Sequence, residues 1–97
     1  MMSEQNRISR TVIVTGELGL HARPAAKVVH IASGFQSELK LRRLDARSGE
    51  ADCRSVLAML MLAACKGTEL ELSACGDDAS AALDAVESYF SRGFDEN

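Results

Sequence analysis

The chain contains one proline, Pro24, and its position indicates where a strand must give way to a helix. The proline ring holds φ near the helical value and lacks an N–H that the first turn of a helix leaves unpaired. A helix should therefore begin within a residue or two of it. Residues 7–15 are rich in β-branched side chains and end at Gly16, which predicts a strand. Residues 16–26 thus contain a strand end, a loop and a helix start.

Hydrophobic periodicity divides the rest of the chain into six further elements. Apolar or small residues at three- and four-residue spacing predict helices, and alternation of apolar with polar residues predicts half-buried strands. The expected helices are residues 21–33, 56–65 and 79–90. The expected further strands are residues 37–44, 51–54 and 68–74, with a turn at 45–50. The order β-α-β-β-α-β-α predicts an α+β fold, a four-stranded antiparallel sheet with three helices on one face.

The composition limits the size and class of the protein. Residues 1–97 suffice for one domain, with an ordered core at about residues 7–90 and fraying at 91–97, where Phe94 is the candidate anchor. A net charge of −3 argues against nucleic-acid binding through a broad basic surface. No apolar run reaches the ~20 residues of a membrane span, and residues 1–6 lack an apolar signal segment. A cytoplasmic protein without membrane contacts is expected.

The cysteines and histidines do not suggest a metal site. Cys53, Cys65 and Cys75 are odd in number and lack metal-ligand spacing, so we expect reduced thiols. Cys65 should fill space in the core, and Cys75 should lie in a loop or at a strand end. At about 100° per residue, His30 falls on the opposite side of its predicted helix from His21. The two histidines therefore cannot share an ion or a proton.

The residues best suited to chemistry lie between the first strand and the first helix. His21 stands at the predicted N-terminal edge of the helix, where unpaired amides and the helix dipole favour an anion. A neutral imidazole nitrogen is a nucleophile, and the Arg23 guanidinium suits phosphate or carboxylate. Gly16 and Gly19 permit a tight backbone path beside a bulky anion. Two interpretations follow: a solvated cap residue, or a histidine that carries a phosphoryl group.

The predicted helix at residues 56–65 is apolar on nearly all sides but too short to cross a membrane. It is either fully buried or presents an exposed patch, Val56, Leu57 and Leu60, to a partner. Ser55 directly precedes it and is a natural N-cap residue.

The run Gly19-Leu20-His21-Ala22-Arg23-Pro24-Ala25 resembles the active-site signature of the HPr family, the histidine phosphocarriers of the phosphoenolpyruvate phosphotransferase system. Further similarity follows in the family's order at residues 34–35, 54–57, 66–68 and 74–78, so the resemblance spans residues 11–90. Three stretches are similar to the nitrogen-related (NPr) branch, namely residues 18–21, 55–62 and 93–96.

The resemblance implies an open-faced β-sandwich and a phosphoryl carrier rather than a turnover enzyme. His21 is expected to accept a phosphoryl group on Nδ1 from an Enzyme I type donor and to pass it to an EIIA type acceptor. Arg23 and the backbone of Gly19, Leu20 and Ala22 are expected to support the phosphate. No metal ion or organic cofactor is expected, and a monomer is the default.

The resemblance also implies a docking surface made of Val56, Leu57 and Leu60. In part of the family the serine that matches Ser55 is phosphorylated by a dedicated HPr kinase/phosphorylase. One departure is Ala63, where HPr-like sequences often have glycine, so the helix is expected to run straighter there. Two alternative functions stay open: an HPr of the sugar-transport branch, and a regulatory module that docks on targets without being phosphorylated.

Overall fold

The computed structural model describes residues 7–45 and 49–96. Its strands are β1 (Arg7–Ile13), β2 (Glu38–Arg43), β3 (Ala51–Asp52) and β4 (Glu69–Cys75). Its helices are α1 (Ala22–Ala32), α2 (Val56–Leu60) and α3 (Ala79–Ser91), followed by the 3₁₀ turn η2 (Gly93–Asp95). The strands form one antiparallel sheet in the order β1-β4-β2-β3.

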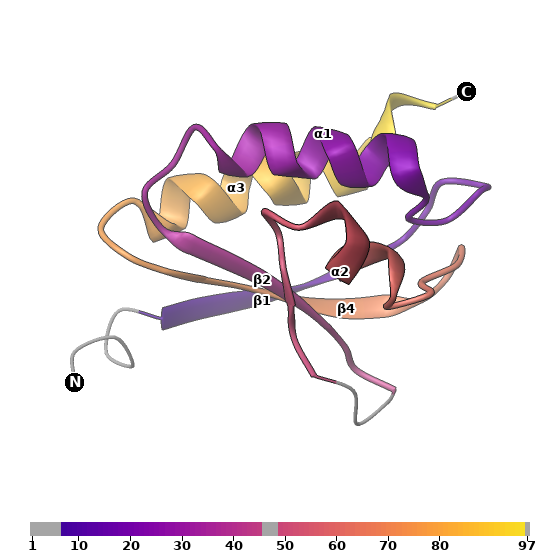
Figure 1. Cartoon of the computed structure of the whole chain (residues 1–97), viewed down its shortest axis with the longest axis horizontal. Coiled ribbons are helices and arrows are strands. Elements are labelled where there is room, and N and C mark those ends of the chain that lie inside the picture. The colour runs from indigo at the N-terminus through magenta and orange to yellow at the C-terminus, as the bar shows by residue number, and fades with distance from the viewer. Residues whose placement is uncertain (1–6, 46–48, 97) are drawn as a thin grey trace.

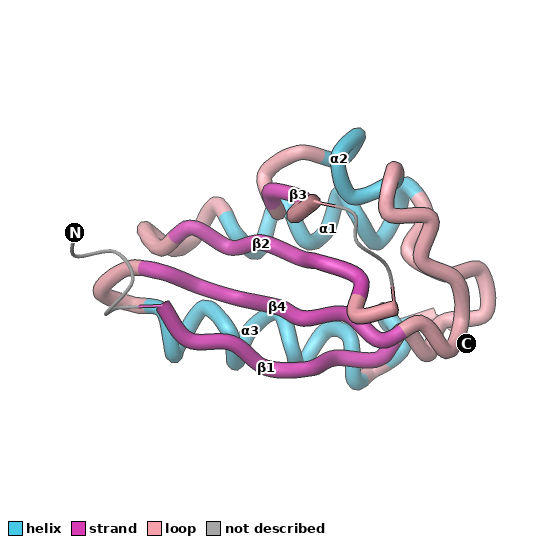
Figure 2. The backbone as a smooth tube through the Cα atoms, turned by 90° about the horizontal axis from the view of Figure 1, so that it is seen from below, coloured by secondary structure: helices cyan, strands magenta, loops and turns pink. Residues whose placement is uncertain are grey.

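The helices and the sheet form two layers. Figure 1 shows α1 and α3 running along one face of the sheet, and Figure 2 shows the strands in front when the molecule is seen from below. The short helix α2 packs against α1 and β3. This arrangement confirms the predicted open-faced α+β fold with four strands and three helices. Among the described residues, no helix is both long enough and apolar enough to cross a membrane.

The core forms where the predicted alternation places apolar side chains on one face of the sheet. Leu41 of β2 lies opposite Leu72 of β4, and both are fully buried. Ala25 and Val28 of α1 are also fully buried. Their small side chains let the helix lie close to the sheet. Cys53, rather than Cys65, fills core space, and burial raises the pKa of its thiol to about 12.

Two predictions about cysteines have different outcomes. Cys65 is exposed, so its expected place in the core is wrong. It lies in a tight turn, where its backbone N–H donates to the Thr68 hydroxyl and its carbonyl oxygen accepts from the Thr68 N–H. Cys75 is half-buried at the end of β4, which confirms its predicted position.

The predicted helix at residues 56–65 is wrong after Leu60. α2 ends there, and Ala63 adopts a left-handed φ of 51°, which a right-handed helix cannot include. Arg43 stabilises this turn, because its guanidinium donates to the carbonyl oxygens of Leu62 and Ala63 at 3.0 Å each. The expectation that Ala63 straightens the helix is therefore also wrong. The chain makes the turn that a glycine would favour, but makes it with alanine.

The C-terminal residues differ from the predicted fraying. The ring of Phe94 is buried, with its centroid 5.2 Å from the Tyr89 ring and 5.0 Å from the Phe90 ring. This packing confirms Phe94 as an anchor and extends the packed structure past residue 90. The predicted turn at 45–50 lies partly outside the described residues. Residues 1–6 and Asn97 lie outside them entirely.

Asp78 joins the segment before β2 to the start of α3. Its carboxylate accepts hydrogen bonds from the N–H groups of Gln36 and Ser37 at 2.9 Å each, and from the Ser37 hydroxyl at 2.6 Å. The bond from the Ser37 hydroxyl, followed by that from the Gln36 N–H, lowers the pKa of Asp78 below its usual range. A carboxyl group whose pKa is lower in the folded state stabilises the fold above its unfolded pKa of about 3.9.

We therefore expect Asp78→Asn to lower the urea midpoint at pH 7. The difference in urea midpoint between Asp78→Asn and the wild type should narrow as the pH falls below about 4. The wild-type carboxylate becomes protonated there, as the pH approaches the lowered pKa of the folded state. Urea denaturation of both proteins at pH 7 and pH 3 measures this. Asp77→Asn, at the exposed neighbouring position, is the control and should match the wild type. An Asp78→Asn gap of equal size at both pH values would contradict the prediction.

Candidate functional site

His21 is the N-cap residue of α1. Its backbone is extended, with φ −91° and ψ −170°, and its carbonyl oxygen accepts the N–H of Ala25 at 3.0 Å. Helix geometry leaves the N–H groups of Ala22 and Arg23 without intrahelical acceptors, and Pro24 has no N–H. The helix begins two residues before Pro24, as predicted. A donor-rich helix terminus therefore lies directly at His21.

The loop before His21 is held against the turn after α2. Gly19 has a left-handed φ of 72°, and a Cβ at this position would lie 2.6 Å from the carbonyl oxygen of Ala64. The same oxygen accepts the N–H of Leu20 at 2.9 Å, and the Leu20 side chain is buried. The tight path predicted for Gly19 is confirmed. The turn around Ala63 consequently helps to place His21.

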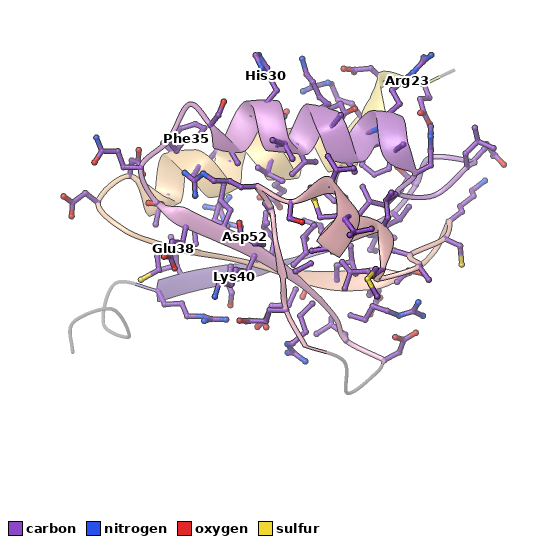
Figure 3. The ribbon with its side chains drawn as sticks, viewed as in Figure 1. Arg23, His30, Phe35, Glu38, Lys40 and Asp52 are labelled. Atoms are coloured by element: carbon purple, nitrogen blue, oxygen red, sulfur yellow. The ribbon has the colours of Figure 1, made fainter. Side chains whose placement is uncertain are left out.

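Arg23 lies on the first turn of α1 and is exposed. Figure 3 shows it at the end of α1 that adjoins the C-terminal segment, whereas His30 projects further along the helix. Arg23 and His21 line an open hollow of about 940 Å³, together with Leu18 and Glu96. Within residues 7–45 and 49–96, the guanidinium of Arg23 has no hydrogen-bond or ion-pair partner. It is therefore free to meet an anion that enters the hollow.

Glu96 is the residue of this site that sequence reasoning missed. Its Oε2 lies 2.7 Å from Nε2 of His21, although the two residues are 75 positions apart. Both side chains are partly shielded from solvent, at 32% exposure for His21 and 22% for Glu96. No local pattern predicts this contact. The available signal was the NPr-like ending at residues 93–96, which was not assigned a role.

The second candidate region is α2 and the turn after it. The Ser55 hydroxyl accepts the N–H of Ala58 at 3.0 Å, which confirms Ser55 as the N-cap residue. Leu57 is 69% exposed and Leu60 36%, whereas Val56 is half-buried against the core. The exposed part of the run thus includes two of the three predicted patch residues. It also includes Met61, which is 76% exposed.

The fold, with a histidine at the start of α1, is that of the small phosphocarrier proteins of the phosphotransferase system. The family model described as "PTS HPr component phosphorylation site" matches residues 8–92, and the chain belongs to the HPr family. This finding confirms the predicted family. It also makes the chain a phosphocarrier protein rather than an enzyme in the usual sense.

Individual relatives refine the comparison. Phosphocarrier protein NPr of Escherichia coli (strain K12) is 42% identical over 90 residues, covering 93% of this chain and 98% of the relative. Phosphocarrier protein HPr of Treponema pallidum (strain Nichols) is 40% identical over 89 residues, covering 92% and 98%. The crystal structure of HPr-C-His from Thermoanaerobacter tengcongensis has a TM-score of 0.84 at 30% identity, covering 93% and 98%. The predicted similarity to NPr is therefore confirmed at the level of sequence.

Proposed function

We propose that this protein carries a phosphoryl group on His21, which it accepts from an Enzyme I type donor and passes to an EIIA type acceptor. The observation that carries the proposal is the position of His21 at the N-terminus of α1, in an open hollow that it shares with Arg23. The similarity to NPr proteins favours a nitrogen-related regulatory branch. The relative from Treponema pallidum, named HPr, keeps the sugar-transport branch as the alternative.

The transfer step uses groups that this site brings together. The lone pair of Nδ1 attacks phosphorus, the N–P bond to His21 forms, and the bond from phosphorus to the donor breaks and leaves its electrons on the donor. The transferred oxygens then lie near the amides of Ala22 and Arg23 and the Arg23 guanidinium, which balance their charge. Gly19 and Leu20 support the site by fixing the loop. The step requires no metal ion or organic cofactor.

The apolar residues of α2 provide a docking surface in this proposal. Leu57 and Leu60 expose apolar area to solvent beside the turn that holds the His21 loop, and Val56 borders them. A partner that covers this surface gains hydrophobic free energy while its reacting group approaches His21. Phosphorylation of Ser55 by an HPr kinase/phosphorylase would place a charge beside this surface. That charge would weaken docking by the cost of desolvating it.

Intact-protein mass spectrometry tests the carrier function. We expect the wild type to gain one phosphoryl group when mixed with phosphoenolpyruvate and a phosphorylating Enzyme I, and His21→Ala to gain none. His30→Ala is the matched control, because His30 is exposed on the same helix away from the hollow, and it should be phosphorylated like the wild type. Faster reaction with the nitrogen-type donor than with the sugar-type donor would support the nitrogen-related branch.

Two outcomes would contradict this proposal. Failure of the wild type to gain mass with any donor would leave a docking module without phosphorylation as the function. Mass gain by His21→Ala equal to that of the wild type would place the phosphoryl group elsewhere in the chain.

A further inference from the structure

We propose that residues 93–96, here called the C-terminal turn, position the ring of His21 through Glu96, so that Nδ1 presents its lone pair to the phosphoryl donor. The inference rests on the proposed carrier function. It assigns Glu96 as a positioning residue, because Glu96 acts on the histidine and not on the phosphoryl group.

The contact between Glu96 and His21 determines which ring nitrogen carries the proton. A neutral imidazole has one nitrogen that donates and one that accepts, and an ionised carboxylate can only accept. With Oε2 of Glu96 2.7 Å from Nε2 of His21, the proton must be on Nε2 and the lone pair on Nδ1. The partial shielding of both side chains strengthens this charge-assisted bond. The bond thus selects the tautomer that the proposed transfer requires.

The backbone of the C-terminal turn is held in an unfavourable conformation. Gly93, Phe94 and Asp95 have φ values of 65°, 61° and 58°, all in the left-handed region. Residues other than glycine remain there only where surrounding contacts hold them. The contacts here are the ring packing of Phe94 on Tyr89 and an ion pair at 2.7 Å between the Arg92 guanidinium and the Asp95 carboxylate. The conformation that they maintain is the one that brings Glu96 to His21.

The C-terminal turn also packs against the loop that leads to His21. A Cβ at position 16 would lie 2.9 Å from Cδ2 of Phe94 and 3.1 Å from Oε1 of Glu96, so Gly16 leaves room for both side chains. The loop and the turn are consequently matched in shape on one side of the hollow. Glu96 therefore contacts the His21 ring from a turn that packs against the loop before His21.

The transfer step gives the Glu96 contact a chemical consequence. As Nδ1 bonds to phosphorus, the ring gains positive charge while Nε2 keeps its proton, and the electron pair of the broken bond stays with the donor. A carboxylate at Nε2 stabilises this charged ring more than the neutral ring. The phosphoryl group bonds to the other ring nitrogen, away from the negative Glu96. The same contact therefore favours the step without opposing the bound phosphoryl group.

The test compares Glu96→Gln with Glu87→Gln and the wild type in two measurements. Nitrogen-15 NMR of the unphosphorylated proteins, at a pH where His21 is neutral, reports which ring nitrogen carries the proton. Reactions quenched at successive times and analysed by intact-protein mass spectrometry report the rate of phosphorylation by Enzyme I. Glu87→Gln is the matched control, because it makes the same chemical change at an acid of α3 that bonds to Arg10 rather than to His21.

We expect the wild type and Glu87→Gln to carry the proton on Nε2. In Glu96→Gln the amide can also donate to Nε2, so the fraction with the proton on Nδ1 should rise and the phosphorylation rate should fall at least about tenfold. A wild-type proton on Nδ1, or a Glu96→Gln protein with unchanged tautomer or unchanged rate, would overturn the inference. The NMR measurement needs no phosphorylation. A failure of this inference is therefore distinguishable from a failure of the proposed function.

Discussion

Gly19→Ala should lower the free energy of unfolding by about 2–4 kcal/mol. The added Cβ would lie 2.6 Å from the carbonyl oxygen of Ala64 and 3.0 Å from Cα of Cys65, and neither backbone atom can rotate away. Overpacking of this kind typically costs about 1–3 kcal/mol, and the left-handed conformation of Gly19 costs an alanine about 1 kcal/mol more. Either the loop or the turn after α2 must therefore move.

The same substitution should slow phosphorylation of His21 by about 10–100-fold, since a displacement near 1 Å in a reacting group can cost about 100-fold. The reason is that the Ala64 carbonyl oxygen also accepts the N–H of Leu20, the residue before His21. Movement that relieves the contact with Cβ also shifts this hydrogen bond. Phosphorylation kinetics at a temperature where the variant remains folded measure the effect on the site separately from the effect on stability.

Gly67→Ala provides the matched control for Gly19→Ala. Gly67 also has a positive φ, 94°, but a Cβ there would meet no atom within 4 Å. The free energy of unfolding of this variant should therefore fall only by the conformational cost, about 1 kcal/mol, and the variant should be phosphorylated at the wild-type rate. Urea denaturation of both variants makes the comparison. Equal losses of stability and rate would mean that close packing at Gly19 is not what places His21.

Met59→Ala should lower the free energy of unfolding by about 2–5 kcal/mol, whereas Met61→Ala should change it by no more than about 0.5 kcal/mol. Met59 is fully buried, so its truncation removes buried apolar atoms and leaves a cavity. Met61 is 76% exposed, so its truncation removes little buried area. The two substitutions are chemically identical and two residues apart, which makes each the control for the other.

Urea denaturation measures the two stabilities, and phosphorylation by Enzyme I measures docking. Met61→Ala should retain stability but react more slowly at low protein concentration, because it removes apolar area next to Leu57 and Leu60. A large loss of stability in Met61→Ala would contradict the end of α2 at Leu60. It would favour instead the continuous apolar helix that the sequence pattern predicts.

Most of the fold was predictable because its causes are local. Pro24 favours a helix start through its own fixed φ. The alternation of polar residues with Leu39 and Leu41 predicts a strand with one buried face. Ser55 satisfies the first amides of the helix that follows it in the chain. The positions of His21 and Arg23 were predictable for the same reason, since a helix terminus and the residues on its first turn are neighbours in sequence.

The features that prediction missed depend on contacts between distant parts of the chain. The run at residues 56–65 has uniform helical character, but Arg43 stabilises a turn at Ala63 by binding two of its carbonyl oxygens. Periodicity within residues 56–65 could not predict this turn, because Arg43, which stabilises it, lies on β2.

The residues of the loop and the first helix therefore specify a histidine at a helix N-terminus, which short-range conformational preferences are sufficient to define. Only the tertiary structure decides the surroundings of that histidine. The burial of Phe94 against Gly16 brings Glu96 to Nε2 of His21, and the turn after α2 supports Leu20. Such contacts depend on packing between segments that meet only in the folded chain, so no local pattern encodes them.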